Sequence, residues 1–305
     1  MFEPSFKLAE NGIPVLSHNE IEKHAVEFVK SFAPECLKKP QSLDIERFAE
    51  SYLELTLDFD YLSNDGSVLG RLVFNTTDEM PVYNPEKNLA EYTLVTRGLV
   101  MLDQSLSEEQ NERLLRSTMA HEAGHWIYHQ EYFTYSEYQA RFWTSKESWG
   151  TSCSREAIEG RYELKTDMDW TEHQAKYFSS CLLMPKPAVE LLADSKAFRE
   201  ITRSAYTISD KKKKVIALAA DTFQVSKGMA EIRLEQVGAL QFLKEDAVRL
   251  DLLMITQDFE GISLEAEKPK APRRRRKPVL SRYEKELIES YNRMVKRSEE
   301  MMNQK

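Results

Sequence analysis

The chain has 305 residues, of which 41% are hydrophobic, and it carries a formal net charge of −8. This length and composition suffice for a substantial buried core and for more than one domain. No apolar run approaches the roughly eighteen residues of a membrane span, so we expect no membrane-spanning segment.

The charge is unevenly distributed. From Lys268 onward, thirteen Lys and Arg stand against five Glu, a local charge of +8 that leaves −16 on residues 1–267. Affinity for nucleic acid rests largely on neutralising phosphates, so the acidic part is a poor general nucleic-acid binder. The three cysteines are scattered and the first residues lack the pattern of a signal peptide. Both observations favour a cytoplasmic protein with reduced thiols.

The first elements are predicted from the spacing of apolar residues. Helical spacing runs from Glu20 to Leu55, and Pro34 and Pro40 divide this stretch into two helices. Strand-like segments follow, in the order Asp58–Leu62, Val68–Phe74, Met80–Tyr83 and Tyr92–Leu102. We expect a small antiparallel sheet, one edge strand of which can bind an extended peptide by backbone hydrogen bonds. The sequence does not identify that strand.

A long helix is predicted next, because no proline interrupts the run from Leu106 to Tyr135. Ser105 with Glu108, or Ser107 with Gln110, fits a capping box at its start.

The most informative motif of the chain lies in this helix, where residues 121–125 read H-E-A-G-H. His121 and His125 are four residues apart and share a helix face, so both can bind one metal ion, and neutral imidazole suits zinc. Glu122 lies about 100° around the same turn, where a general base can take a proton from metal-bound water. This pattern on a helix is a metalloprotease signature. The alternative is a buried helix whose two histidines are satisfied by hydrogen bonds. His129, one turn beyond His125, is predicted to be a surface or supporting residue and not a ligand.

Catalytic zinc usually has three protein ligands, so a third is expected from a separate element. The best candidate is Glu172, on a predicted helix whose inward face continues with Ala175, Phe178 and Leu182. A competing interpretation makes Asp169 the N-cap of that helix and Glu172 its capping-box partner. The residues alone leave this choice open, and His173 is the second candidate for a ligand.

Residues 116–129 read R-S-T-M-A-H-E-A-G-H-W-I-Y-H and resemble the hallmark R-F-T-x-A-H-E-x-G-H of the ImmA/IrrE family of bacterial metallopeptidases. Residues 172–185 resemble the family's second motif, E-x-x-A-x-x-F-A-x-x-L-L-M-P, with Ser179 in place of an alanine. Residues 217–234 are similar to its helix-turn-helix-like segment, and the matches together cover Ile13 to Leu240. Ser117 replaces an aromatic residue of the hallmark. The interval between the two motifs is longer than in compact members, which implies an insertion.

The resemblance implies an α+β fold with a zincin-like metallopeptidase domain at residues 13–190 and a helical, helix-turn-helix-like segment at residues 191–260. It implies a zinc site formed by His121, His125 and Glu172, with Glu122 as the base. It further implies that the substrate is a helix-turn-helix transcriptional repressor, whose cleavage releases stress-response or mobile-element genes.

Composition defines the remaining segments: a basic flexible linker at residues 261–280 and an amphipathic helix or tail at residues 281–305. The linker can contact nucleic acid weakly and without sequence preference. In the helix-turn-helix-like segment, Ser226 can cap a recognition helix, yet Glu231 and Glu235 flank Arg233, which favours a scaffold or partner-binding role over DNA reading.

Other features leave alternatives open. Aromatic residues gather between Gln130 and Arg161, and we interpret them as packing in preference to a substrate wall. Tyr162, His173 and Tyr206 are candidates for stabilising a tetrahedral oxyanion, and spacing does not choose among them. The second functional hypothesis is a non-proteolytic sensor or partner-binding module whose basic tail contacts nucleic acid, and a third is a toxin-like partner in a two-gene module.

Overall fold

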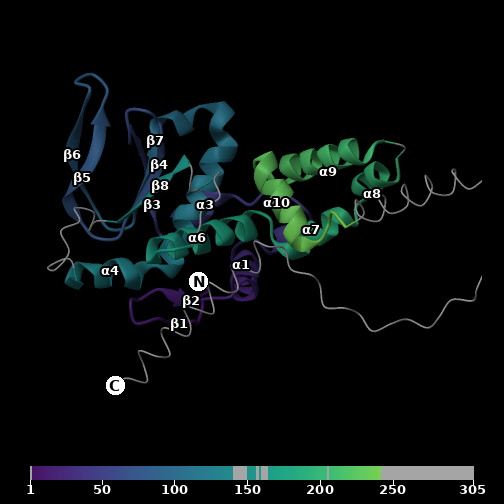
Figure 1. Ribbon diagram of the computed structural model, residues 1–305, viewed down its shortest axis with the longest axis horizontal. Coiled ribbons are helices and arrows are strands. Elements are labelled where there is room, and N and C mark those ends of the chain that lie inside the picture. The colour runs from purple at the N-terminus through teal and green to yellow at the C-terminus, as the bar shows by residue number, and fades with distance from the viewer. Residues whose placement is uncertain (1, 140–149, 156–157, 159–163, 205, 242–305) are drawn as a thin grey trace, which may run out of the picture. The chain divides into compact units, whose positions relative to one another are not determined.

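A computed structural model describes residues 2–139, 150–155, 158, 164–204 and 206–241 of the chain. Helices predominate and small sheets accompany them, and residues 1–240 form one compact unit (Figure 1). The prediction of a mixed α and β fold is confirmed at this level. None of the helices in the described part of the chain combines the length and the apolar character needed to cross a membrane.

The N-terminal region begins with a two-stranded ladder, β1 (Lys7–Leu8) and β2 (Pro14–Val15), which leads into helix α1 (His18–Phe32). Ser17 and Glu20 form a capping box at the start of α1. The 3₁₀ turn η1 (Pro34–Leu37), helix α2 (Ile45–Arg47) and the π-helical turn η2 (Phe48–Tyr52) follow. The predicted break at Pro34 is confirmed, but the second predicted helix is short and irregular.

Four strands form one sheet in the order β3-β7-β4-β8. Their bounds are β3 (Thr56–Asp60), β4 (Val68–Val73), β7 (Leu99–Asp103) and β8 (Gly150–Ser154). Strand β4 is antiparallel to both β7 and β8, whereas β3 and β7 run parallel. The expectation of a purely antiparallel sheet is therefore wrong for β3 and β7, because β4 and a hairpin intervene between them and return the chain in its original direction.

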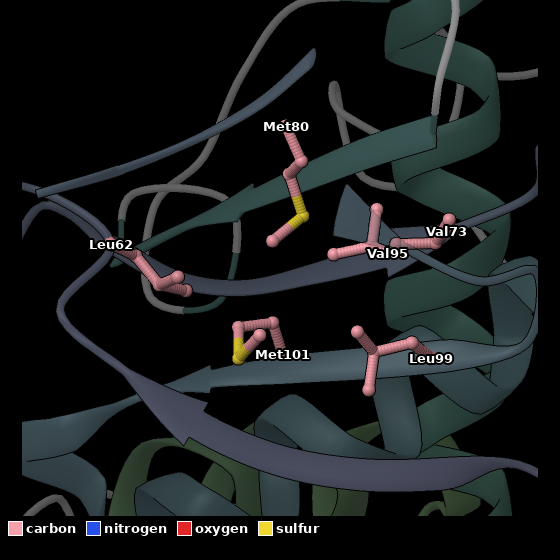
Figure 2. Close-up of a cluster of buried hydrophobic side chains, with 6 residues drawn as sticks. All are labelled: Leu62, Val73, Met80, Val95, Leu99 and Met101. Atoms are coloured by element: carbon pink, nitrogen blue, oxygen red, sulfur yellow. The ribbon is translucent and has the colours of Figure 1, made fainter. Parts of the chain in front are cut away.

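That hairpin, β5 (Thr77–Asn84) and β6 (Leu89–Val95), is a separate two-stranded unit. The strand predicted from Tyr92 to Leu102 is in fact two strands, β6 and β7, because the chain turns at Gly98, where φ is +85°. Figure 2 shows the apolar cluster between the hairpin and the sheet, made of Leu62, Val73, Met80, Val95, Leu99 and Met101. This buried contact packs the hairpin against the sheet.

Helix α3 (Glu112–Tyr128) carries the motif of residues 121–125 and is shorter than predicted. Two 3₁₀ turns, η3 (Gln104–Ser107) and η4 (Glu109–Asn111), precede it, and it ends at His129 before α4 (Gln130–Gln139). Neither predicted capping box forms. Instead, Asp103 is the N-cap of η3, where its side chain accepts a hydrogen bond from the Ser105 N–H. The cap therefore forms ahead of the positions that the sequence predicted.

Helix α3 is covered on two sides, so its middle turns are buried from Ser117 to His125. Strand β4 lies so close that a Cβ on Gly70 would stand 2.8 Å from Thr118 Cγ2. On the other side runs α6 (Asp167–Leu183), and the two helices lie side by side at the centre of the unit (Figure 1). A Cβ on Gly124 would stand 3.0 Å from Ala175 Cα. The two glycines therefore allow the sheet and α6 to approach one helix from both sides.

The C-terminal part of the described chain consists of α7 (Lys186–Ala193), α8 (Lys196–Arg203), α9 (Ile208–Phe223) and α10 (Lys227–Val237). Ser226 caps α10 as predicted. The turn between α9 and α10 is bound to α3: Arg116 donates to the Gln224 carbonyl (3.0 Å) and Arg113 to the Val225 carbonyl (3.3 Å). The helix-turn-helix-like segment thus supports the helix that carries the motif.

Arg233 of α10 points into the protein. Its guanidinium is fully buried, donates to both carboxylate oxygens of Glu22 on α1, and donates through Nε to the Met184 carbonyl (2.9 Å). Tyr177 donates to the same carboxylate (3.1 Å), and Cys181 lies beside it. We call these four side chains the Arg233 cluster. Because Arg233 is committed to Glu22, it is not available to bind a phosphate, which favours the scaffold interpretation of this segment.

Of the predicted aromatic cluster, Phe133 stacks on Phe74 with ring centroids 4.7 Å apart, a contact that belongs to the core. The side chains of Tyr135, Tyr138, Phe142, Trp143 and Trp149 lie outside the described residues, as do the predicted linker at 261–280 and the tail at 281–305.

Candidate metal centre

Three side chains from two helices converge at the crossing of α3 and α6. His121 Nε2 and His125 Nε2 are 3.0 Å apart, Glu172 Oε2 is 3.1 Å from the first, and Glu172 Oε1 is 3.2 Å from the second. His121 and His125 come from successive turns of α3, and Glu172 comes from the second turn of α6. We call these three residues the ligand cluster.

The ligand cluster could hold a metal ion. Ligands placed 2.0–2.1 Å from a tetrahedral ion lie about 3.4 Å apart, so a spacing of 3.0–3.2 Å requires only a small expansion. Two imidazole nitrogens and one carboxylate are a donor set that suits zinc and leaves one coordination position open. Both histidines are buried, while Glu172 keeps 15% of its side chain exposed. Solvent therefore reaches the cluster from the side of Glu172.

Glu172 is available as a ligand because another residue completes the cap of α6. Thr166 is the N-cap, and Asp169 closes the capping box by accepting from the Thr166 N–H. The competing interpretation, with Asp169 as N-cap and Glu172 as its partner, is wrong, since the helix begins three residues earlier than that interpretation requires. Glu172 is thereby left to face α3.

His173, the second candidate for a ligand, faces away from the ligand cluster. Its Nε2 lies 2.9 Å from His18 Nε2 on α1, and its ring packs beside Tyr177. Burial and the neighbouring His18 lower the pKa of His173 to about 3. The geometry therefore separates two adjacent residues of α6: Glu172 belongs to the ligand cluster and His173 to the contact with α1.

Glu122 lies on α3 between the two histidines and is fully buried. Its Oε2 accepts a hydrogen bond from the Thr151 hydroxyl on β8 (3.2 Å), and its Oε1 has no hydrogen-bond partner among the described residues. A Cβ on Gly70 would stand 2.9 Å from this Oε1, so β4 passes directly over the carboxyl group. Glu122 is thus held in place through one oxygen while the other remains uncommitted.

The two carboxyl groups of the site have opposite electrostatic environments. Burial raises the pKa of Glu122 to about 7, with the neighbouring Glu172 adding to the shift and His125 opposing it. Burial also disfavours the charge of Glu172, but His125 and His121 outweigh it and hold the pKa of Glu172 well below its usual range. Glu172 is therefore an anion at neutral pH, as a metal ligand must be, whereas Glu122 can both accept and release a proton.

A second layer of side chains supports His125. His129 Nδ1 lies 3.0 Å from His125 Nδ1, and His129 Nε2 lies 3.0 Å from Gln174 Oε1. His129 was predicted to be a surface or supporting group, and its burial shows that it is not on the surface. Gln174 and Thr151 were not predicted. Nothing in the local spacing marks them, because their partners lie 45 and 29 residues away in the chain.

The three oxyanion candidates are not brought together. Tyr162 lies outside the described residues. Tyr206 is half exposed at the surface, where Lys214 Nζ stands 4.5 Å from its ring centroid. His173 faces His18.

No family model matches the chain, and the search of curated proteins finds no match. The resemblance to the ImmA/IrrE family therefore stays a prediction that rests on the motifs.

Proposed function

We propose that the protein is a zinc-dependent endopeptidase with a zincin-like catalytic domain. The observation that carries the proposal is the position of Glu122, a buried carboxyl group with one uncommitted oxygen, on the helix that supplies two members of the ligand cluster. A site that served only to hold a structural metal would have no need of such a group. The two motifs that resemble the ImmA/IrrE family support the same activity.

Each residue then has a defined task. His121, His125 and Glu172 hold the ion, which when bound would polarise the scissile carbonyl and acidify a water molecule. Glu122 is the group that would take a proton from the attacking water, on its uncommitted Oε1, and would deliver it to the leaving amine. Thr151 holds the other oxygen and so orients the carboxyl group.

We propose that the substrate enters as an extended peptide along β8. Among the described strands, β8 and β3 are the edges of the four-stranded sheet, and β8 is the edge that contacts Glu122, through Thr151. A peptide that paired with β8 through backbone hydrogen bonds would run past the ligand cluster. By its resemblance to the family, the protein would act on a helix-turn-helix transcriptional repressor.

The first test measures zinc per chain by elemental analysis, for the full-length wild type and for Glu172→Ala, both purified without chelators. We expect about one zinc per wild-type chain and a clear loss in the variant. His173→Ala is the matched control, because this neighbour faces α1 and should keep its zinc. Absence of zinc from the wild type, even after zinc is added back, would contradict the proposal. Zinc that is retained in Glu172→Ala but lost in His173→Ala would overturn the ligand assignment.

The second test incubates the zinc-loaded protein with candidate helix-turn-helix repressors and looks for fragments by mass spectrometry. Fragments that disappear with a chelator support the peptidase. A stable complex without fragments supports the alternative, a non-proteolytic partner-binding module.

A further inference from the structure

A buried chain of hydrogen bonds leads from His125 to the backbone of β2. It passes through His129 at the end of α3 and Gln174 on α6, and it ends at the Pro14 carbonyl. His125 and His129 are fully buried and Gln174 is 2% exposed, so each polar atom depends on its protein partner. Along this series of hydrogen bonds, the partner of each nitrogen or oxygen atom determines whether that atom carries a hydrogen.

The carbonyl oxygen of Pro14, at one end of this series, can only accept a hydrogen bond. The Gln174 atom beside it, at 2.8 Å, must therefore be the amide nitrogen. This fixes the orientation of the amide group and turns its oxygen, Oε1, toward His129. An amide oxygen is an acceptor, so His129 Nε2 must carry the hydrogen.

At the contact between the two histidines, Nδ1 of His129 faces Nδ1 of His125 at 3.0 Å. A neutral imidazole carries one hydrogen, and His129 has already placed it on Nε2. His129 Nδ1 is therefore the acceptor, and His125 Nδ1 must be the donor. With Nδ1 committed as a donor to His129, Nε2 is the nitrogen of His125 that faces His121 and Glu172 and is left for a metal ion.

We propose that His129 and Gln174 are positioning residues that hold His125 in the tautomer and ring orientation needed to bind a metal ion through Nε2. This inference rests on the proposed zinc site and assigns the residues that prepare it. If His125 took the other tautomer, the hydrogen on Nε2 would point at the metal position, and the ring would have to lose or move that hydrogen before binding. Partners of this kind around a metal-binding histidine typically change metal affinity about 10–100-fold.

The two histidines of the ligand cluster differ in this support. His121 Nδ1 has no hydrogen-bond partner among the described residues, whereas His125 Nδ1 faces His129. His129 follows His125 by four residues at the end of α3, and its ring reaches His125 Nδ1, whereas His125 meets His121 through Nε2 and leaves Nδ1 of His121 without a described partner. The chain of hydrogen bonds therefore acts on one ligand specifically.

The test uses three variants of the full-length protein. His129→Phe keeps a planar ring but removes both nitrogens, and Gln174→Met keeps the length of the side chain but removes the amide. His129→Asn places an amide oxygen near the position of Nδ1, where it can again accept from His125. His24→Phe is the matched control: this histidine also bonds one side chain, Tyr128, but lies outside the chain of hydrogen bonds. Thermal unfolding of each metal-free variant establishes that it is folded.

Two measurements are made on these proteins. Competition with a chromophoric chelator gives the zinc affinity, and NMR of ¹⁵N-histidine-labelled, metal-free protein reports which nitrogen of His125 carries the hydrogen. We expect zinc affinity to fall about 10–100-fold in His129→Phe and less in Gln174→Met, with substantial recovery in His129→Asn and no change in His24→Phe. We expect His125 to carry its hydrogen on Nδ1 in the wild type and in His129→Asn, and to lose this preference in His129→Phe.

The outcomes separate this inference from the proposed function. If His129→Phe binds zinc as tightly as the wild type and His125 keeps its hydrogen on Nδ1, the positioning role is wrong while the zinc site stands. A wild-type His125 with its hydrogen on Nε2 would also overturn the inference. If His125 shows the expected tautomer but the wild type binds no zinc, the positioning contact stands and the proposed function fails.

Discussion

Helix α6 contributes to two buried polar clusters that are built in opposite ways. In the Arg233 cluster, one guanidinium faces one carboxylate, and the contact is bidentate and completed by the Met184 carbonyl. The ligand cluster and Glu122 combine two carboxyl groups with two imidazoles, and among the described residues Glu122 Oε1 and His121 Nδ1 have no hydrogen-bond partner. The first cluster contains its own cation. The second has no such cation among its own side chains and could hold a metal ion.

The pKa shifts express the same difference. Burial disfavours the charge of Glu22, but the hydrogen bond and positive charge of Arg233 outweigh it and keep the pKa of Glu22 below its usual range. Glu122 has no such partner, and burial raises its pKa to about 7. A buried carboxyl group that is matched by a cation is typical of structural support, and one that is left protonatable is typical of a reactive site.

The largest expected effect comes from a substitution beside the ligand cluster, at Glu122. Glu122→Gln should lower peptidase activity about 10²–10⁴-fold, because the amide cannot take a proton from water. Zinc content should not change, since Glu122 is not a member of the ligand cluster. Peptide hydrolysis and elemental analysis measure the two effects. Glu112→Gln, an exposed acid in the first turn of the same helix, is the control and should keep full activity. Full activity in Glu122→Gln would refute its role as the base.

The next effect breaks the Arg233 cluster. Arg233→Met leaves the Glu22 carboxylate buried without its cation and should lower the free energy of unfolding by about 3–5 kcal/mol. The double variant with Glu22→Gln should be more stable than Arg233→Met alone, because no unpaired charge remains. Denaturant titrations give these values. The partly exposed pair of Lys212 with Glu231 provides the control, and Lys212→Met should cost at most about 1 kcal/mol. If Arg233→Met and Lys212→Met lowered the free energy of unfolding equally, the structural role assigned to the Arg233 cluster would be contradicted.

A smaller effect is expected where α3 and α6 touch. Gly124→Ala places a methyl group 3.0 Å from Ala175 Cα, so the helices must separate slightly at the level of Glu172. We expect a loss of about 1–3 kcal/mol in the free energy of unfolding together with weaker zinc binding. Gly228→Ala on α10 is the matched control, because its Cβ would meet only Ser226 Oγ, at 3.9 Å. That substitution should be neutral or stabilising. Unchanged zinc affinity in Gly124→Ala would mean that the close approach does not position Glu172.

The smallest expected effect is a pH dependence of stability, which sharpens the contrast between Glu22 and Glu122. Since the folded pKa of Glu22 lies below the unfolded value near 4.5, its ion pair stabilises the protein fully above that pH and loses its contribution as the pH falls toward the folded pKa. The difference in unfolding free energy between wild type and Glu22→Gln should therefore shrink on acidification below about 4.5. A difference that grows on acidification would contradict the assigned direction.

Two members of the ligand cluster were predictable because their information is local: the spacing of His121 and His125 fixes their common face within a single helix. The residues alone left Glu172 open as the third member, and the resemblance of the second motif favoured it. The predicted boundaries were less accurate. The long helix from Leu106 to Tyr135 breaks at His129, and the strand from Tyr92 to Leu102 divides at Gly98. Apolar spacing continues through both positions, so it does not reveal the breaks.

The supporting contacts were not predictable, because they join segments far apart in the chain. Strand β8 was not foreseen, and its Thr151 reaches Glu122 only through pairing with β4, some eighty residues earlier. Gln174 meets Pro14 across 160 positions. The sequence shows Arg233 only as a charge flanked by Glu231 and Glu235, whereas its partner Glu22 is 211 residues away. Periodicity identifies the face that an element buries, but it does not identify the residue that meets that face.

The burial of α3 between β4 and α6 restricts which sequences can carry this site. At Gly70 and Gly124 the nearest atoms belong to Glu122, Thr118 and Ala175, so even an alanine at either position displaces part of the site. Divergence at these two glycines would therefore cost stability and chemistry together. In a distant relative that lacks the proposed activity, the two glycines should drift along with Glu122. In one that has kept it, they should persist even where the surface has changed completely.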